Sequence, residues 1–366
     1  MSRPKEISTP ALVALSASEW VNENVTSLAA EITDRHFAAQ PALLEEYGAK
    51  GKQKYRDDAA FHLHYLSEAI SANSIRIFVD YVGWAKIMLV SRGIGSYDLE
   101  QTLEFMKVVL VGTASPADGA VFASFIDAAL TALPKLPESM PTLIPRDRPF
   151  ATVANNYLRS LLLLNGDEAV GYIVQQVDAG LRIKDVFEHV ILAAQQEVGR
   201  LWQMNQITVV QEHYCTAMAE LVLTRLRRKY IGTRRDVSAL TLCAEGEEHC
   251  LGVKLFSELL QADGWKVTYI GAKSPTQDVV KHLQSFSADV IAISVATALA
   301  LGKTKQLINA IKRFIPRRRP RIIVGGAITY SDPKALEWLG ADAFATDIWD
   351  GVAIANRFVT QRRKAG

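Results

Sequence analysis

The feature that most constrains this chain is a change in its hydrophobic pattern near Ser238. Before that point apolar residues recur with helical spacing, and after it short apolar runs alternate with helical segments. The expected strands cover residues 239–244, 266–270, 290–295, 321–324 and 341–345. This alternation predicts a doubly wound, mostly parallel α/β sheet of the Rossmann-like type over residues 236–366. Ligands of such sheets bind at the carboxyl ends of the strands.

A histidine follows the first expected strand. It belongs to the pattern Glu247-x-His249-x-x-Gly252. A neutral imidazole is a good metal ligand, and a nearby carboxylate can hold its second ring nitrogen and raise its basicity. The glycine leaves space where something bulky approaches the backbone. Ser294 and the pair Gly325-Gly326 end two further expected strands, so we predict one binding crevice.

The residues before Ser238 are expected to be helical in two separate groups. The first group, residues 1–133, predicts an all-helical domain with helices at 18–39, 53–70, 75–90, 99–111 and 119–133. Five prolines in residues 134–150 predict an extended linker. The second group, residues 151–235, predicts an antiparallel four-helix bundle with helices at 153–164, 167–178, 183–204 and 208–230.

Composition excludes several classes of function. A net charge of +2 gives no electrostatic reason to expect nucleic acid or an anionic membrane as a partner. No apolar run reaches the roughly 18 residues of a membrane span, and the first residues lack the apolar core of a signal peptide. Only three cysteines occur, without zinc-type spacing. We therefore expect a cytoplasmic protein.

The three strand-end motifs together resemble the cobalamin-binding domain of methionine synthases, mutases and cobalamin photoreceptors. The resemblance rests on Glu247-x-His249-x-x-Gly252, on Ser294-Val295-Ala296 and on Gly325-Gly326. It implies that His249 is the lower cobalt ligand in place of the cofactor's benzimidazole, and that Glu247 orients it. It also implies that Ser294 meets the benzimidazole, and that Gly325 and Gly326 make room for the nucleotide tail.

The expected bundle carries a second resemblance. Trp202, Val209, Glu212 and His213 form a Trp-x9-Glu-His pattern similar to the helical cap of light-sensing, adenosylcobalamin-dependent repressors. There these residues surround the adenosyl group on the upper face of the corrin. In those repressors a histidine directly after the tryptophan binds cobalt once light has expelled the adenosyl group. Here that residue is Gln203, so His213 or water are the alternatives.

Residues 40–48 and 78–86 resemble the N-terminal region of photocobilins, whose globin-like helical domain binds biliverdin. No cysteine precedes Cys215, so a bilin in residues 1–149 could not be thioether-linked within that domain. Arginine suits propionate recognition, and an imidazole can meet the pyrrole nitrogens. The alternative is that these charges solvate the surface while the aromatic rings fill a helical core. The candidate bilin residues are Arg56, Arg76, Lys86 and Arg92 for the propionates, His62, His64, Asp57, Asp58 and Tyr65 for the pyrrole side, and Tyr81 and Trp84.

These resemblances imply a light sensor rather than an enzyme. Light would break the cobalt–carbon bond of adenosylcobalamin, and the emptied cap would repack and change self-association. A homo-oligomer with light-dependent assembly is expected, and a separate output protein is possible. One alternative is a corrinoid carrier subunit for a methyltransferase or mutase partner. Another is a plain cobalamin storage module.

Overall fold

The computed structural model describes residues 9–230, 232–316 and 319–365. The chain divides into two compact units, Met1–Glu138 with Ser331–Trp338, and Ser139–Tyr330 with Leu339–Gly366. The expectation about a signal peptide falls on the first eight residues and lies outside the described part.

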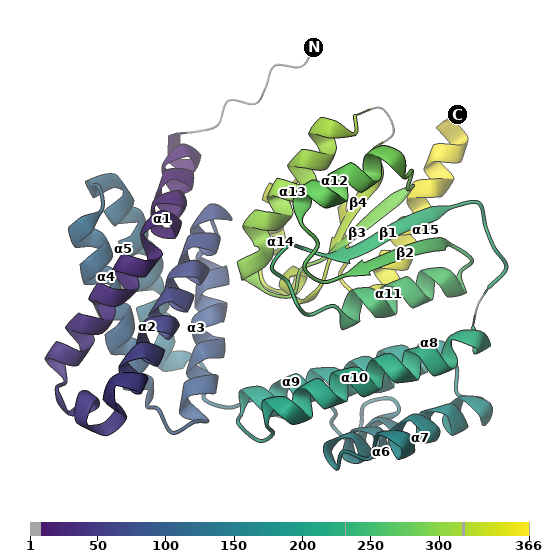
Figure 1. Ribbon diagram of the computed structural model, residues 1–366, viewed down its shortest axis with the longest axis horizontal. Helices are drawn as coiled ribbons and strands as arrows, with labels where there is room; N and C mark the ends of the chain where they lie inside the picture. The colour runs from purple at the N-terminus through teal and green to yellow at the C-terminus, as the bar shows by residue number, and fades with distance from the viewer. Residues whose placement is uncertain (1–8, 231, 317–318, 366) are drawn as a thin grey trace. The chain divides into compact units, whose positions relative to one another are not determined.

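The described part of the N-terminal unit is built mainly from the helices α1 to α5 (Figure 1). The expected helix at 75–90 is confirmed, with Ser74 accepting a hydrogen bond from the Ile77 amide as its N-cap. The second helix starts earlier than predicted and is interrupted at Gly48, where φ is 62°. The helices are α1 Thr9–Ala39, α2 Ala42–Ser71, α3 Ile75–Val90, α4 Ser96–Thr113 and α5 Pro116–Ala132, followed by the 3-10 turn η1 Leu133–Lys135; the short helix α14 Pro333–Leu336 also belongs to this unit.

One helical stretch of the described chain, Pro116–Lys135, has the length and apolar composition to cross a membrane. The expectation that no such run exists was therefore too strict. Core helices of soluble proteins pass the same test, so this stretch is weak support for a membrane span.

The bundle occupies the start of the second unit. The expected third bundle helix is split in the structure by a π-helical segment, η2 Val186–Leu192. Its apolar core continues into the next domain, because Leu255 and Leu259 belong to the same buried cluster as the bundle helices. The bundle elements are α6 Ala151–Leu162, α7 Gly166–Asp178, α8 Ile183–Asp185, η2, α9 Ala193–Gln203, α10 Val209–Leu226 and η3 Arg227–Lys229.

The proline-rich segment before the bundle is fixed to helix α9. Glu197, 4% exposed, accepts hydrogen bonds from the Leu143 amide at 2.7 Å and the Thr142 hydroxyl at 3.1 Å. Arg200 holds the same carboxylate at 2.7 and 3.0 Å and donates to the Met140 carbonyl at 3.1 Å. The segment is thus irregular but docked, rather than a free spacer.

We expect Glu197→Ala to loosen this docked segment and to destabilise the second unit by about 3 kcal/mol, because a buried arginine and an amide lose their partner. Burial by itself would raise the pKa of Glu197, but the bonds from Arg200 and Leu143 outweigh it and lower that pKa. The carboxylate therefore stabilises the fold above its unfolded pKa of about 4.3, and this contribution is lost as pH falls through the lower folded pKa. Urea unfolding midpoints at pH 7 and at pH 3 check the loss of stability and its pH dependence. The variant should unfold at a lower urea concentration than the wild type at pH 7, and the difference should be smaller at pH 3; equal midpoints at pH 7 would contradict the prediction.

The sheet domain follows the bundle. Five parallel strands lie in the order β2-β1-β3-β4-β5, with β1 Ser238–Cys243, β2 Lys266–Gly271, β3 Val290–Ser294, β4 Arg321–Gly325 and β5 Ala343–Phe344. The parallel α/β prediction is confirmed, although the last strand is shorter than expected. Helices α11 Leu251–Ala262 and α15 Ile348–Ala365 contact each other on one face, and α12 Thr276–Ser285 and α13 Leu301–Phe314 on the other (Figure 1).

The strand order reverses between β1 and β3, which is where ligands of such sheets bind. The register pairs Cys243 with Ser294 and Ser294 with Gly325. The last residues of β1, β3 and β4 therefore lie side by side at one edge of the sheet, and the loops that follow these strands leave from the same edge. Short 3-10 turns follow two of these strands, η4 Ala298–Ala300 after β3 and η5 Ala327–Tyr330 after β4, whereas η6 Glu337–Leu339 follows α14.

Candidate functional site

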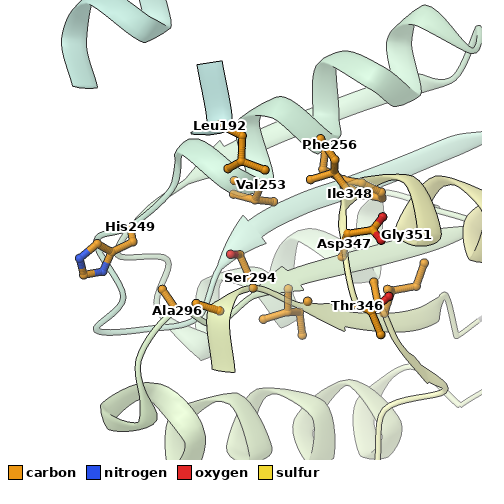
Figure 2. A pocket seen from close by; sticks show the side chains of 18 of the residues that line it. Leu192, His249, Val253, Phe256, Ser294, Ala296, Thr346, Asp347, Ile348 and Gly351 are labelled. Atoms are coloured by element: carbon orange, nitrogen blue, oxygen red, sulfur yellow. The ribbon is translucent and has the colours of Figure 1, made fainter. Parts of the chain in front are cut away.

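A cleft of about 260 Å³ opens at the carboxyl ends of β3 and β4, on the face covered by α11 and α15. Figure 2 shows His249 at one end of the cleft and Asp347, Ile348 and Gly351 at the other. Ser294 and Ala296 lie on one side, opposite Leu192, Val253 and Phe256. Leu192 and Gln196 come from the bundle, so both domains of the second unit build this cleft.

Glu247 organises the loop after β1. Its side chain is 2% exposed, and Oε1 accepts hydrogen bonds from the backbone amides of Glu248 and His249 at 3.0 and 2.9 Å. Oε2 accepts the amides of Ala296 and Thr297 at 2.9 and 3.0 Å. One carboxylate therefore ties the β1 loop to the β3 loop.

The same carboxylate sets the tautomer of His249. Oε1 lies 2.5 Å from His249 Nδ1. Burial alone would raise the pKa of Glu247, but the bonds from the His249 ring and backbone and from Thr297 lower it to about 2. An ionised carboxylate can only accept, so Nδ1 carries the proton. In the neutral ring the lone pair is then on Nε2, and the side chain is 70% exposed. This is the arrangement of a metal-ligating histidine.

The hydrogen bond to Glu247 raises the pKa of His249 more than burial lowers it, and the charges of Glu247 and Glu212 add to the increase. A metal ion and a proton would compete for Nε2, so ligation is favoured as pH rises.

The strand-end glycines line the cleft for different reasons. Gly326 has φ +109°, and an added Cβ would lie 2.3 Å from the Val295 carbonyl oxygen. Close backbone packing, rather than room for a ligand alone, therefore requires this glycine. At Gly325 an added Cβ would make only ordinary contacts, the nearest at 3.6 Å to Ala345. At Gly252 it would meet nothing within 4 Å, so this position is open towards the cleft.

The side chains of Ser294 and Val295 have different surroundings in the structure. Ser294 lines the cleft and is 8% exposed. Val295 is fully buried and is not among the residues that line the cleft, so its place among the cofactor-binding residues stays a prediction. Strand alternation explains the different surroundings, because neighbouring side chains point to opposite faces of the sheet. Its backbone instead binds the glycine loop, donating to the Gly325 carbonyl at 2.8 Å.

The cap residues lie at one end of the α9–α10 hairpin. Gln195 donates to the Cys215 carbonyl at 3.0 Å, which sets the register of two antiparallel helices. Trp202 lies seven residues after Gln195, and Thr208 lies seven residues before Cys215. Because the two helices are antiparallel, Trp202 therefore lies beside the start of α10. Val209 at that start is 50% exposed. Of the four cap candidates, none lines the 260 Å³ cleft itself.

Glu212 and His213 form a pair on α10. His213 Nδ1 lies 2.5 Å from Glu212 Oε2, and the Thr216 hydroxyl donates to the other oxygen at 3.2 Å. The His213 side chain is 76% exposed. Gln203 is only 5% exposed and lies within the bundle. Of these two side chains, His213 is the one accessible to a bound cofactor.

Two of the bilin candidates meet in the N-terminal unit. The Tyr81 hydroxyl lies 2.6 Å from His62 Nδ1, and Tyr81 stacks on Tyr65 with ring centroids 3.7 Å apart. Trp84 lies beside Tyr81 at 6.3 Å. Burial lowers the pKa of His62 to about 4, so this imidazole is neutral at pH 7. The cavity that His62 and Tyr81 line holds about 50 Å³, well below the roughly 300 Å³ of a small-molecule pocket.

The basic bilin candidates do not converge on this aromatic cluster. Arg76 is exposed and lies 3.7 Å from Asp80, and Arg56 has a buried Nε without a hydrogen-bond partner among the described residues. Lys86 was a candidate for a propionate, but it is 3% exposed and donates to the Leu133 and Leu136 carbonyls. It anchors the end of the helical unit, and Arg92 donates to the Met88 carbonyl.

Several cleft residues were not predicted from the sequence. Leu192, Gln196 and Phe256 sit on helices where nothing in the pattern separates them from core or surface positions. Asp347 follows the last strand, and the strand-end rule could have found it. Its carboxylate accepts the Trp349 and Asp350 amides at 2.7 and 2.8 Å and so caps α15.

Comparison with known proteins agrees with this geometry. Residues 237–348 and residues 153–227 match two families, each described as a B12 binding domain. The HTH-type transcriptional repressor CarH of Myxococcus xanthus is 25% identical over 186 residues, 50% of this chain and 61% of CarH. The chain thus spans less than two thirds of that relative.

Corrinoid proteins are also similar. Dimethylamine corrinoid protein 1 of Methanosarcina acetivorans is 24% identical over 199 residues, 52% of this chain and 91% of its own length. The solved structure of the Methanosarcina barkeri monomethylamine corrinoid protein aligns over 56% of this chain and 98% of its own, with a TM-score of 0.50 and 18% identity, which shows a shared fold.

These relatives are named as a repressor and as corrinoid proteins, in agreement with the expectation that the chain is not an enzyme. The chain contains two successive B12 binding domains, residues 153–227 and 237–348, and is a cobalamin-binding protein.

Proposed function

We propose that this protein is a cobalamin-dependent light sensor that uses adenosylcobalamin, with His249 as the lower cobalt ligand. The observation that carries the cobalt assignment is the Glu247–His249 pair, which leaves Nε2 exposed at the strand ends of a B12 binding domain. The residues fit the cofactor, because Gly252 leaves the space beside the histidine open and a cleft continues behind it.

The light-sensing part of the proposal rests on the cap. When bound, adenosylcobalamin supplies a cobalt–carbon bond that light breaks. Trp202, Val209 and Glu212 would enclose the adenosyl group, because they lie at the same end of the α9–α10 hairpin and Val209 is half exposed. Once that group is lost, these side chains would repack and bias self-association. His213 is the side chain that could then approach cobalt.

Absorption spectra of the adenosylcobalamin-loaded protein, in the dark and after illumination, test this proposal together with gel-filtration volumes. We expect light to change both, and Trp202→Ala to alter adenosyl retention more than corrin uptake. The matched control is Trp338→Ala, which lies in the N-terminal unit. A spectrum and an elution volume that ignore light would refute light sensing while leaving cobalamin binding intact.

The second candidate is a corrinoid carrier that serves a methyltransferase or mutase partner. It is favoured by the dimethylamine corrinoid protein, 91% of whose length is aligned. The two functions differ in the group retained on cobalt. A carrier should bind methylcobalamin and adenosylcobalamin with similar dissociation constants. Light should then change its absorption spectrum but not its gel-filtration volume.

We also propose that the N-terminal helical unit is a globin-like domain and that it binds biliverdin non-covalently as a second chromophore. The Tyr65–Tyr81–Trp84 stack and the neutral His62 supply aromatic faces and a polar nitrogen. Because the present cavity is small, binding would require these side chains to move apart. Addition of biliverdin to the protein should give a bound absorption spectrum that Tyr81→Ala abolishes; no spectral change on addition would rule the bilin out.

A further inference from the structure

Gln196 presents a free carboxamide to the cobalamin cleft from the bundle side. It is exposed and lines the cleft together with Leu192. Its neighbours are engaged elsewhere, Gln195 with the Cys215 carbonyl and Glu197 with Arg200. Among the described residues the Gln196 side chain has no hydrogen-bond partner, so its donor and its acceptor are both available.

The π-helical segment places this side chain. Segments of this kind are rare and often occur at functional sites. Val186–Leu192 ends at Leu192, and Gln196 follows one helical turn later on α9, so both residues share the face that meets the cleft. A π-helix holds more residues per turn than an α-helix, so it turns the face of α9 relative to a continuous helix. The irregularity thus sets which α9 side chains face the cleft.

The chemistry of the cleft indicates what Gln196 binds. Among the described residues that line it none is a lysine or an arginine, so no side-chain cation is there to pair with a carboxylate on the ring edge. Asp347 Oδ1 accepts the Trp349 and Asp350 amides and so caps α15, and Thr346 donates to Asp350. A neutral carboxamide with a free donor and a free acceptor complements another amide, and the corrin ring of cobalamin carries primary amides around its edge.

We propose that Gln196 hydrogen-bonds a peripheral amide of the corrin ring and so makes this site prefer amidated corrinoids to their carboxylate forms. The inference rests on the cobalamin binding of the chain and is independent of light sensing. It adds a specificity residue that comes from the bundle and lines the same cleft as Ser294.

The experiment measures dissociation constants for cobalamin, for cobalamin monocarboxylates made by mild acid hydrolysis, and for cobinamide, which keeps the ring amides but lacks the nucleotide. We expect Gln196→Leu to weaken cobalamin binding about five- to tenfold, the effect of one lost hydrogen bond, and to reduce the preference for amides over carboxylates. Gln175→Leu makes the same chemical change on an exposed face of α7 outside the cleft and should leave every constant unchanged.

The measurement with cobinamide distinguishes contacts to the corrin ring from contacts to the nucleotide tail. An equal loss with cobinamide supports the ring amide, whereas a loss confined to cobalamin would overturn the ring assignment in favour of the nucleotide tail. Unchanged affinity and selectivity in a Gln196→Leu protein that melts at the wild-type temperature would overturn the proposal. A wild-type protein that binds no corrinoid would instead contradict cobalamin binding itself.

Discussion

His249→Ala is expected to shift bound cobalamin to a base-off spectrum and to weaken its binding by at least 100-fold. The reason is that Glu247 holds the proton on Nδ1 of His249, so Nε2 keeps a free lone pair on an exposed imidazole at the mouth of the cleft, and alanine leaves nothing to replace it. His213→Ala is the matched control, because that imidazole is equally exposed but lies on the cap. It should leave the lower-ligand spectrum unchanged.

A graded variant sharpens this test. Glu247→Gln keeps the volume of the side chain but places an amide where one carboxylate oxygen accepts several N–H groups. We expect the base-on spectrum to persist with affinity lowered about 10- to 100-fold, the usual effect of losing an outer partner of a metal ligand. An unchanged spectrum in His249→Ala would mean that another group binds cobalt, and the site would have to be reassigned.

Gly326→Ala is expected to destabilise the sheet domain by about 3 kcal/mol and to abolish cobalamin binding. An added Cβ would lie 2.3 Å from the Val295 carbonyl oxygen, and φ of +109° is strained for any residue with a side chain. The β4 loop would have to move, and that loop lines the cleft.

Gly325→Ala is the matched control for the neighbouring glycine. Its Cβ would make an ordinary contact at 3.6 Å with Ala345, so its unfolding midpoint in urea should stay close to that of the wild type. If both variants unfold at the wild-type urea concentration, close packing against Val295 is not what requires glycine in this loop.

Much of the fold was predictable because its signals are local. Strands β1 to β4 follow from short apolar runs with helical segments between them, and helix α3 from its periodicity and the Ser74 cap. The boundaries that failed involve long-range packing. Helix α2 starts at Ala42, whereas the hydrophobic pattern predicted a start at residue 53. The early turns include Leu43, whose side chain is buried against the rest of the unit.

The candidate site divides in the same way. Glu247, His249 and Ser294 are recognisable because strand-end position and short spacing are properties of the chain itself. The buried side chain of Val295 lies outside the cleft lining, and a motif does not say which side of a strand each residue faces, so its contact with the cofactor stays a prediction. Leu192 and Gln196 were missed because a π-helical segment, invisible in the pattern, sets the face that α9 presents.

The sequence by itself determined a parallel α/β sheet, a helical bundle before it and a histidine with its carboxylate at the first strand end, because these depend on residues close together in the chain. Only the tertiary structure decided that Glu247 joins two loops, that Gly326 is required by the Val295 carbonyl, and that the bundle supplies one wall of the cleft. The physical reason is that burial and hydrogen bonding between residues distant in sequence depend on how whole elements pack, which local periodicity does not encode.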